Sequence, residues 1–599
     1  MRTYEQDVKT LELPWPFTGR EDELELVRGA SATGRPGIVV TGPAGRGKTR
    51  LITEAVRGAE HARVTGTPEA RHLPLAAFAH LLDGTGSLHG AVRALSGVRL
   101  LVVDDAHLLD EASAALVHQL AVHGRTRLVV AATDGVPAPG AVSRLWTGEV
   151  LPRLALAPLP AEDTAELLAW AALEPLTVRR LHQLCRGDLR LLRDLVTELV
   201  TGGRLVAVPG TGERAWRGPL PVTPAVRERL APVRARTGPG EREILERLAF
   251  AEPAPLPLSG FDPTGLDGSD PTGPDLPGSG LPGSHLSASE LDALERLETD
   301  GLIVVGDDGA VALADPLHGP ALRATTGRLR ARRLTGGPDR LGAALDAEQR
   351  DLLRRMAELD VRPAPTTVGD WLVAEGGPVP AGYAAVRARF ARLRGEVRDA
   401  AAWAREGLRR EPGHAGCGAE LALARAESDE PGHVGPDGDD DYARRIAVRL
   451  GLPAGPLPPG SVFARHAEAL ARRDGAALDR AAVALEERGF LLFAAEAHAQ
   501  AVRAHRDPRA ARRSRTRALA LARRCPGART PVLAGLVLGE LTARQRQIVA
   551  LAASGLSNRE IAERLTLSVR TVGNHLYSAY TRLGTGDRGA LPCLVGETA

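Results

Sequence analysis

One octapeptide near the start of the chain combines the residue types that hold a polyphosphate. It reads Gly42, Pro43, Ala44, Gly45, Arg46, Gly47, Lys48 and Thr49, which fits the pattern GxxxxGKT. Glycines let backbone N–H groups approach phosphate oxygens, Lys48 can contact the β- and γ-phosphates, and the Thr49 hydroxyl can ligate Mg²⁺. Lys48 is one of only two lysines in this arginine-rich chain. Residues 42–49 therefore predict a P-loop that binds ATP or ADP with Mg²⁺.

A second candidate site is an apolar run that ends in acid, LLVVDD at residues 100–105. A buried strand ending in carboxylates is the expected partner of a P-loop. We expect Asp104 to hold Mg²⁺ and Asp105 to orient or activate the attacking water, which makes Asp105 the candidate catalytic residue if hydrolysis occurs. For His107, which follows, we expect a structural hydrogen bond rather than proton transfer.

The elements around these residues must bring them to one edge of a sheet. The apolar run at 38–41 precedes the P-loop, a helical pattern follows it, and a third apolar run occupies 128–132. Strands alternating with helices predict a doubly wound parallel sheet, with the nucleotide at the carboxyl ends of the strands. We therefore expect an α/β domain at the start of a multidomain α/β plus α chain.

The other chemically suggestive stretch lies near the end of the chain. Thr542 with Gln545, and Ser557 with Glu560, have the spacing of capping boxes that open two amphipathic helices. Ser568 is the expected N-cap of a third helix. Its buried face is expected to hold the apolar residues spaced i, i+3 and i+7, namely Val569, Val572 and Leu576. Capped helices around a tight turn predict a helix-turn-helix.

The outer face of the third helix carries groups that can contact DNA. Asn574 can hydrogen-bond an adenine edge, with Tyr577 one turn away. Phosphate contacts are expected from arginines on the second and third helices and from hydroxyls near a helix N-terminus. The candidate DNA-binding residues are Arg559, Ser568, Arg570, Thr571, Asn574, Tyr577 and Arg582. An ordinary three-helix surface with solvated charges is the alternative for the pattern alone.

The residues GLSNREIAERLTLSVRTVGNHL, followed by YTRLG and Arg588, resemble the LuxR-type DNA-binding domain over roughly 541–591. Two positions depart from that family. Gly573 stands where the family usually has a basic residue, and Gln545 stands where it usually has Glu. Gln545 preserves the capping box, whereas Gly573 removes a DNA contact, so base recognition should depend more on Asn574 and Tyr577.

The amino-terminal motifs GRED, GPAGRGKT, VVDDAHLLD and LALAPLP resemble the signalling (STAND) ATPases of large ATP-binding LuxR-type (LAL) regulators. Here too the chain departs from the family. The third strand ends in Thr133-Asp134, where the family often has a sensor arginine. The usual Gly-Asn-Pro contact appears as Gly187-Asp188-Leu189. The resemblance thus implies nucleotide binding, with at most slow hydrolysis acting as a switch.

The remaining segments give the expected domain organisation. A stretch rich in Pro, Gly, Ser and Asp cannot bury a core and is expected to be a disordered loop. The expected parts are a loose lead-in at 1–19, the P-loop domain at 20–159, a helical lid at 160–240, a winged-helix-like module at 241–325 with its disordered loop at 253–284, helical repeats at 326–530, and the helix-turn-helix domain at 536–599.

The region 326–530 is rich in Ala, Leu and Arg and contains patterns similar to tetratricopeptide (TPR) units, with loops at 431–441 and 451–460. Stacked helices could bind a peptide, a small effector or another protomer, and a plain helical spacer is an equal alternative. Residues 501–530 carry ten arginines and one acid. This run is either a solvated face or a source of additional phosphate contacts.

Composition adds broad constraints. The net charge is +2, so any basic surface for nucleic acid must be local. Four scattered cysteines show no metal-ligand spacing, and no apolar segment is long enough to predict a signal peptide or a membrane span. We therefore expect a cytoplasmic protein.

Together the motifs and resemblances predict a transcription regulator with nucleotide-gated binding to double-stranded DNA. The resemblance implies an activator that forms a homodimer or larger oligomer on DNA, works with RNA polymerase, and controls a secondary-metabolite gene cluster. Two other classes stay open. One is a signalling ATPase with an incidental helix-turn-helix, and the other is a helical-repeat scaffold with a vestigial P-loop.

Overall fold

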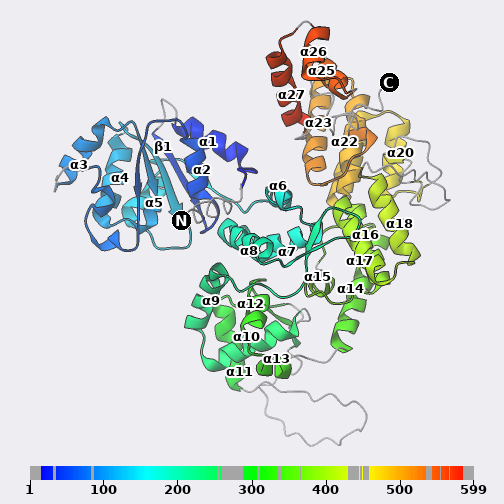
Figure 1. Ribbon diagram of the computed structural model, residues 1–599, viewed down its shortest axis with the longest axis horizontal. Helices are drawn as coiled ribbons and strands as arrows, with labels where there is room; N and C mark the ends of the chain where they lie inside the picture. The colour runs from blue at the N-terminus through cyan, green and yellow to red at the C-terminus, as the bar shows by residue number, and fades with distance from the viewer. Residues whose placement is uncertain are drawn as a thin grey trace, which may run out of the picture. The chain divides into compact units, whose positions relative to one another are not determined.

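The computed structural model comprises two compact units, Met1–Thr335 and Gly336–Ala599, each described by itself. Figure 1 labels helices and the strand β1. The structure describes residues 15–31, 36–82, 87–123, 125–252, 256–257, 288–306, 310–334, 339–364, 366–428, 444, 448–449, 457–533, 543–553, 555–565 and 567–583.

The first unit begins with an α/β domain built on a parallel sheet of five strands. The strands are β1 (Gly37–Gly42), β2 (Ala62–Thr65), β3 (Leu100–Asp104), β4 (Arg127–Thr133) and β5 (Arg153–Ala155), in the order β2-β3-β4-β1-β5. The predicted parallel sheet is therefore confirmed. Strand β4 separates the two strands that carry the predicted motifs, because it pairs with β1 on one side and β3 on the other.

Helices cover both faces of this sheet (Figure 1). Helices α1 (Glu21–Ser31) and α2 (Lys48–Ala55) contribute to the core on one face, and α3 (Leu88–Ala94), α4 (Glu111–His123) and α5 (Gly140–Thr147) to the core on the other. This burial explains why β1 and β3 have continuous apolar sequences rather than alternating ones. The predicted loose lead-in is wrong for Trp15, whose ring packs edge-on against Trp170 at 5.9 Å between centroids.

A helical subdomain follows the sheet. It contains α6 (Ala161–Leu167), α7 (Pro175–Cys185), α8 (Leu189–Thr201), the hairpin strands β6 (Leu205–Ala207) and β7 (Arg214–Trp216), and α9 (Pro224–Arg236). Trp216 is 1% exposed and belongs to the apolar core of this subdomain. The sequence patterns predicted the helices but missed the hairpin, because its strands are only three residues long.

The first unit ends in a module of helices and a small antiparallel sheet. Its elements are α10 (Pro239–Ala251), β8 (Leu256–Pro257), α11 (Ala288–Thr299), β9 (Ile303–Val305), β10 (Ala310–Leu313), α12 (His318–Thr325) and α13 (Arg328–Leu334). Most of the predicted disordered loop lies outside the described residues. For Leu256 and Pro257 that prediction is wrong, because both pair with β10. The module also extends past 325, since Arg330 on α13 forms an ion pair with Glu246 on α10.

The second unit is helical. It contains α14 (Asp339–Ala357), α15 (Thr367–Ala374), α16 (Ala381–Arg394), α17 (Val397–Arg410), α18 (Ala415–Ala426), α20 (Val462–Ala471), α21 (Gly475–Glu487), α22 (Leu491–Ala504) and α23 (Pro508–Arg523). Short links join α16 to α17, α21 to α22 and α22 to α23, and the helices of each pair pack against one another. Three phenylalanines, Phe463, Phe490 and Phe493, pack edge-on in the core. TPR-like repeats stay a prediction, and the predicted loops at 431–441 and 451–456 lie outside the described residues.

A buried ion cluster lies within these helices. The Arg449 guanidinium donates from Nε to Glu496 Oε2 and from Nη1 to Glu427 Oε1, each at 2.6 Å. Glu496 is fully buried and Arg449 is 2% exposed. The guanidinium also lies 4.5 Å from the centre of the Phe493 ring. Because both charges are removed from water, removing one partner leaves the other uncompensated.

We expect Glu496→Ala to destabilise the helical unit by about 3 kcal/mol, since it leaves part of a buried guanidinium unpaired. Glu486→Ala is the matched control, because Glu486 pairs with Arg524 at the surface with 41% and 51% of the side chains exposed. The control should cost less than about 1 kcal/mol. Amide hydrogen exchange in α22 measures both, and equal costs would contradict the assignment.

Candidate functional site

The loop between β1 and α2 has the backbone conformation that a phosphate cradle requires. Gly45 and Gly47 have φ angles of +78° and +86°, which side-chain-bearing residues rarely adopt. Lys48 begins α2 and is 7% exposed. Its Nζ donates to Gly42 O at 2.8 Å and to Pro43 O at 2.9 Å, and burial lowers its pKa. The loop therefore holds Lys48, one of the two cations of the motif, against its own carbonyl oxygens.

The acidic end of β3 lies beside this loop. Asp104 is 4% exposed, and its Oδ1 accepts a hydrogen bond from Thr49 Oγ1 at 3.1 Å. A hydroxyl next to a carboxylate is the pair that holds Mg²⁺ in P-loop proteins. The structure thus brings together the two predicted metal ligands, and their oxygens fit a hard divalent cation.

Asp104 has a partner that the sequence did not reveal. Arg63 Nη2 on β2 donates to Asp104 Oδ2 at 2.5 Å. The sequence pattern did not predict the strand β2, because it has only four residues and Val64 alone is buried. Pairing of β2 with β3 sets Thr65 opposite Asp104, which puts Arg63 near the carboxylate.

Asp105 follows in a left-handed conformation, with φ of +47°. Its side chain is 42% exposed, and its backbone N–H donates to Asp104 Oδ1 at 3.1 Å. Burial raises the pKa of Asp105, and the neighbouring Asp104 carboxylate adds to that rise. The predicted structural hydrogen bond of His107 is present, since its Nδ1 accepts from the Thr133 N–H at 3.4 Å and burial lowers its pKa.

The end of β4 carries an acid where the resembled family has an arginine. Asp134 accepts from Arg153 Nη2 at 3.0 Å, and Arg153 Nε donates to Thr41 Oγ1 at 2.8 Å. The cation at this edge of the sheet therefore comes from β5 rather than β4. The sequence patterns did not predict Arg153 as part of this edge, because β5 has only three residues and none of them is fully buried.

The helical subdomain contacts the P-loop through the residues just before α8 and the first residue of α8. The Leu189 N–H donates to Gly45 O at 2.9 Å, and Arg46 Nη1 donates to Arg186 O at 2.7 Å. A Cβ placed on Gly45 would lie 2.0 Å from Asp188 Oδ1. That carboxylate has little freedom to move, because it caps α8 and forms an ion pair with Arg229 at 3.0 Å. Residues 188 and 189 therefore contact the loop at 42–49 directly, while the nucleotide contact that the usual Gly-Asn-Pro makes in the resembled family stays a prediction for this segment.

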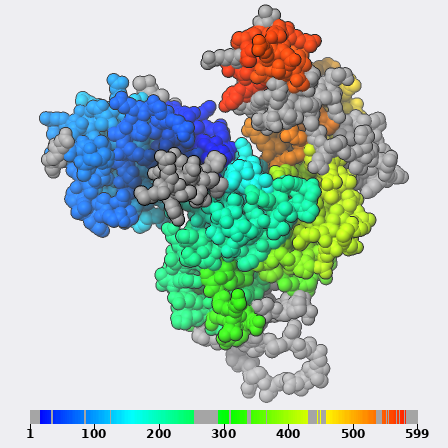
Figure 2. All heavy atoms as spheres, viewed as in Figure 1, coloured from blue at the N-terminus to red at the C-terminus, as the bar shows by residue number. Residues whose placement is uncertain are grey.

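The second candidate site is a three-helix unit near the carboxyl end, formed by α25 (Ala543–Ala553), α26 (Asn558–Leu565) and α27 (Val569–Leu583). In the space-filling view its described atoms form a rounded orange-red surface (Figure 2). Its core residues are Ile548, Val549, Ala552, Ile561, Ala562, Val572, Leu576 and Ala579. Val572 and Leu576 are among them, so the burial that the helical spacing predicted for the third helix is confirmed with one exception.

The exception is Val569, whose predicted burial is wrong, because it is 50% exposed. Val569 is the first residue of α27, one turn before the first buried position, Val572, so its side chain extends past the core. The predicted caps at Ser557 and Ser568 are confirmed. Ser557 N donates to Glu560 Oε2 at 2.6 Å with the reciprocal bond at 3.4 Å, and Ser568 Oγ accepts from Thr571 N at 3.0 Å. Thr542 lies outside the described residues.

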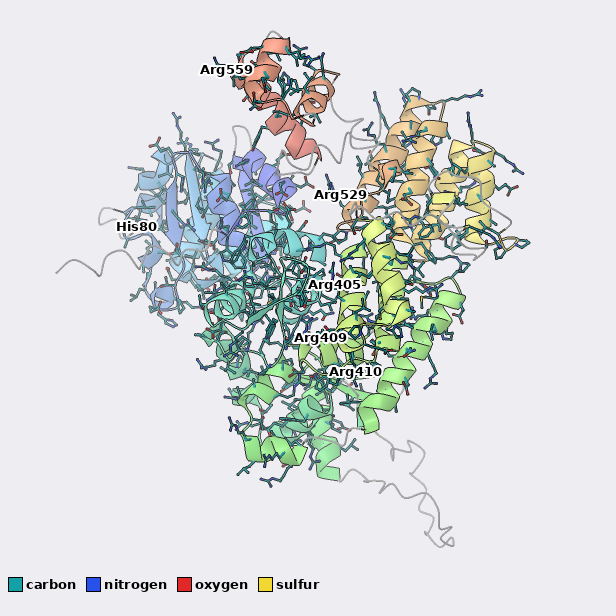
Figure 3. All side chains as sticks on the ribbon, turned by 45° about the vertical axis from the view of Figure 1, so that its right-hand side comes forward. His80, Arg405, Arg409, Arg410, Arg529 and Arg559 are labelled. Carbon is teal, nitrogen blue, oxygen red and sulfur yellow. The ribbon has the colours of Figure 1, made fainter. Side chains whose placement is uncertain are left out.

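The predicted DNA-contacting side chains are largely at the surface. Ser568 and Asn574 are exposed, Thr571 is half-buried and Tyr577 is 76% exposed. Arg559 projects from the outer surface of the unit (Figure 3), and its Nε lies 3.6 Å from Glu563 Oε1. Arg570 and Arg582 belong to α27, but their side chains lie outside the described residues.

Comparison with known proteins identifies this unit. Residues 539–595 match the model of the family described as bacterial regulatory proteins, luxR family. HTH-type transcriptional regulators of Mycobacterium bovis and Mycobacterium tuberculosis are 48% identical over 50 residues, which is 8% of this chain and 6% of each relative. The chain therefore carries a LuxR-type helix-turn-helix domain, while the match leaves most of both proteins uncompared.

A solved structure gives a weaker likeness. The Thermotoga maritima RuvB Holliday junction branch migration motor matches with a TM-score of 0.25 and 13% identity, over 53% of this chain and 94% of that chain. A TM-score this low carries no argument about the fold. Among the described helices, none has the length and apolar content needed to cross a membrane.

The contact between Gly45 and Asp188 can be tested with a matched pair of glycines. Gly45→Ala should cost about 1–2 kcal/mol for the positive φ and should also separate α8 from the loop. Gly135→Ala is the control, because Gly135 has φ of +77° but no atom within 4 Å of a built Cβ. Only Gly45→Ala should accelerate exchange of the Leu189 amide. Equal exchange rates in the two variants would contradict the contact.

Proposed function

We propose that this protein is a transcription regulator of the large ATP-binding LuxR type, in which nucleotide bound at the P-loop governs sequence-specific DNA binding by the helix-turn-helix domain. The observation that carries the proposal is the family match over residues 539–595. The helix α27 supports it, because it has an exposed face and an N-terminus capped by Ser568. The rest of the proposal concerns what regulates that domain.

In this proposal α27 enters the major groove of double-stranded DNA. Asn574 reads an adenine edge and Tyr577 contacts the neighbouring base or sugar. The N-terminus of α27, with Ser568 and Thr571, faces a phosphate, because unpaired backbone N–H groups there favour anions. Further phosphate contacts come from Arg559, Arg570 and Arg582.

The proposed cofactor is ATP or ADP with Mg²⁺. Residues 42–49 hold the phosphates, with Lys48 at the β- and γ-phosphates, and Thr49 and Asp104 hold the metal. The 3.1 Å hydrogen bond between Thr49 and Asp104 supports this assignment. Asp105 orients the attacking water in a slow hydrolysis that serves as a switch. Its raised pKa and partial exposure suit a group that exchanges a proton with water.

The P-loop and the helical subdomain share a contact that nucleotide can alter. Phosphate bound to the backbone N–H groups of the loop changes the electrostatic surroundings of the Asp188 carboxylate, which lies against Gly45. A nucleotide whose affinity differs between two arrangements of α8 shifts their populations. Propagation of that shift to the DNA-binding domain is part of the proposal.

The remaining elements of the proposal follow the resembled regulators. The protein acts in the cytoplasm as an activator, forms a homodimer or larger oligomer on a partly symmetric operator, and contacts RNA polymerase. The helical unit at 326–530 provides a surface for a peptide or small effector. Control of a secondary-metabolite gene cluster is the proposed physiological role.

Asn574→Ala and Arg559→Ala should affect DNA binding in different ways. Asn574→Ala removes a base contact, so we expect a loss of about 1–3 kcal/mol for the preferred sequence and little loss for others. Arg559→Ala should weaken binding to all sequences and lower the salt slope by about 1. Titrations of selected and random duplexes at several salt concentrations measure both. A full-length protein without salt-sensitive DNA binding would contradict the proposal.

Nucleotide binding should depend on the two predicted motifs. Lys48→Ala should lower ATP affinity at least about 100-fold, because a charge-assisted contact to buried phosphate is lost. Asp104→Ala should remove the Mg²⁺ dependence of binding. Arg57→Ala is the control, since Arg57 lies just beyond α2 with 73% of its side chain exposed. Equal ATP affinity for wild type and Lys48→Ala, measured by calorimetry, would show that the P-loop is not the nucleotide site.

A further inference from the structure

The exposed face of α27 carries an unexpected apolar stripe. Val569 and Tyr577 are 50% and 76% exposed, and Gly573 lies midway between them. The spacing i, i+4 and i+8 places all three on one line along the helix. The core is formed by a different line, Val572 and Leu576, so the stripe is not part of the packing of the domain.

Among the described residues of the domain, nothing requires a glycine at position 573. A glycine in a helix interior costs roughly 0.8–1 kcal/mol relative to alanine. The φ angle of Gly573 is not positive, so the backbone there does not require glycine. A Cβ built on Gly573 would have no described atom within 4 Å. Alanine would therefore fit and would strengthen the helix. A glycine at such a place suits the close approach of another molecule to the backbone.

The surroundings of the stripe indicate which molecule that is. Between residues 543 and 583 the sequence has six arginines and two acids, so the domain as a whole is positive. The exposed amide of Asn574 and the N-cap hydroxyl of Ser568 are described polar groups next to the stripe. Such surroundings suit a polyanion more than an apolar protein patch. In the major groove of DNA, the C5-methyl of thymine is the apolar group on the base edges.

We propose that the stripe Val569, Gly573 and Tyr577 reads thymine methyl groups in the major groove. This inference rests on the proposed DNA-binding function and adds a base feature to it. Val569 contacts a thymine methyl, and the missing side chain at Gly573 lets the helix axis come close enough for that contact. Tyr577 borders the same line one turn farther on. Val569 is thus a specificity-determining residue, which its predicted burial had hidden.

The test removes single methyl groups from the DNA and compares wild-type protein with a variant of Val569. Full-length wild-type protein first selects its preferred duplex from random-sequence DNA, and each thymine of that duplex is then replaced by deoxyuridine, which lacks only the methyl. At the contacted thymine we expect binding to weaken about fourfold per methyl removed. Val569→Ala should bind thymine and deoxyuridine duplexes equally well, because its contact with the methyl is gone.

Val304→Ala is the matched control, because Val304 is 52% exposed on β9. It should retain the full fourfold deoxyuridine effect. If wild type binds its selected duplex but no deoxyuridine replacement weakens binding, or if Val569→Ala keeps the effect, the thymine assignment is overturned while the proposed function stands. If wild type selects no duplex, the proposed function itself fails. Loss of self-association by Val569→Ala without DNA would instead assign the stripe to a protein contact and overturn the proposal.

Gly573→Ala gives an independent test, because it should raise the stability of α27 and lower the affinity for DNA. Amide exchange in α27 should slow, because alanine stabilises the helix, while affinity for the selected duplex should fall at least about tenfold, because the added methyl holds the helix away. Gly418→Ala is the control, since Gly418 lies inside α18 with no atom within 4 Å of a built Cβ. It should leave DNA affinity unchanged. Unchanged DNA affinity in Gly573→Ala would overturn the role of close approach.

Discussion

The contact between Gly45 and Asp188 is the constraint that links the α/β domain to the helical subdomain. Only a residue without a side chain allows the carboxylate of Asp188 to lie against the P-loop, and Asp188 also caps α8 and pairs with Arg229. The same backbone that would receive phosphates therefore supports the first turn of the helical subdomain. A shift of the loop backbone at Gly45 would therefore also displace the start of α8, because the two are in close contact.

The two candidate sites use the same physical device in different ways. At each, the first turn of a helix presents backbone N–H groups, which favour an anion. At the P-loop, Lys48 begins α2 and adds a fixed charge for phosphates. At α27, the N-cap Ser568 accepts a hydrogen bond from Thr571 N and organises the first turn. In the proposed regulator, one site senses a nucleotide phosphate and the other grips a DNA phosphate.

Sequence reasoning located both sites because each depends on local chemistry. The glycines and Lys48 of the P-loop, Asp104 after its apolar strand, and the Ser557 capping box are all determined within a few residues. Arg63, Arg153 and the exposure of Val569 could not be predicted in this way. The two arginines reach the site from short strands whose neighbours are set by sheet order, and Val569 lies at a helix end where periodicity gives no boundary for the core.

The central claim is that nucleotide at the P-loop governs where the helix-turn-helix domain binds DNA. Genome-wide mapping of bound DNA, with wild type and Lys48→Ala expressed at equal levels, tests it most directly. The account predicts that Lys48→Ala, with its DNA-binding domain intact, loses or redistributes most of the wild-type sites. Identical maps for the two proteins would contradict the claim.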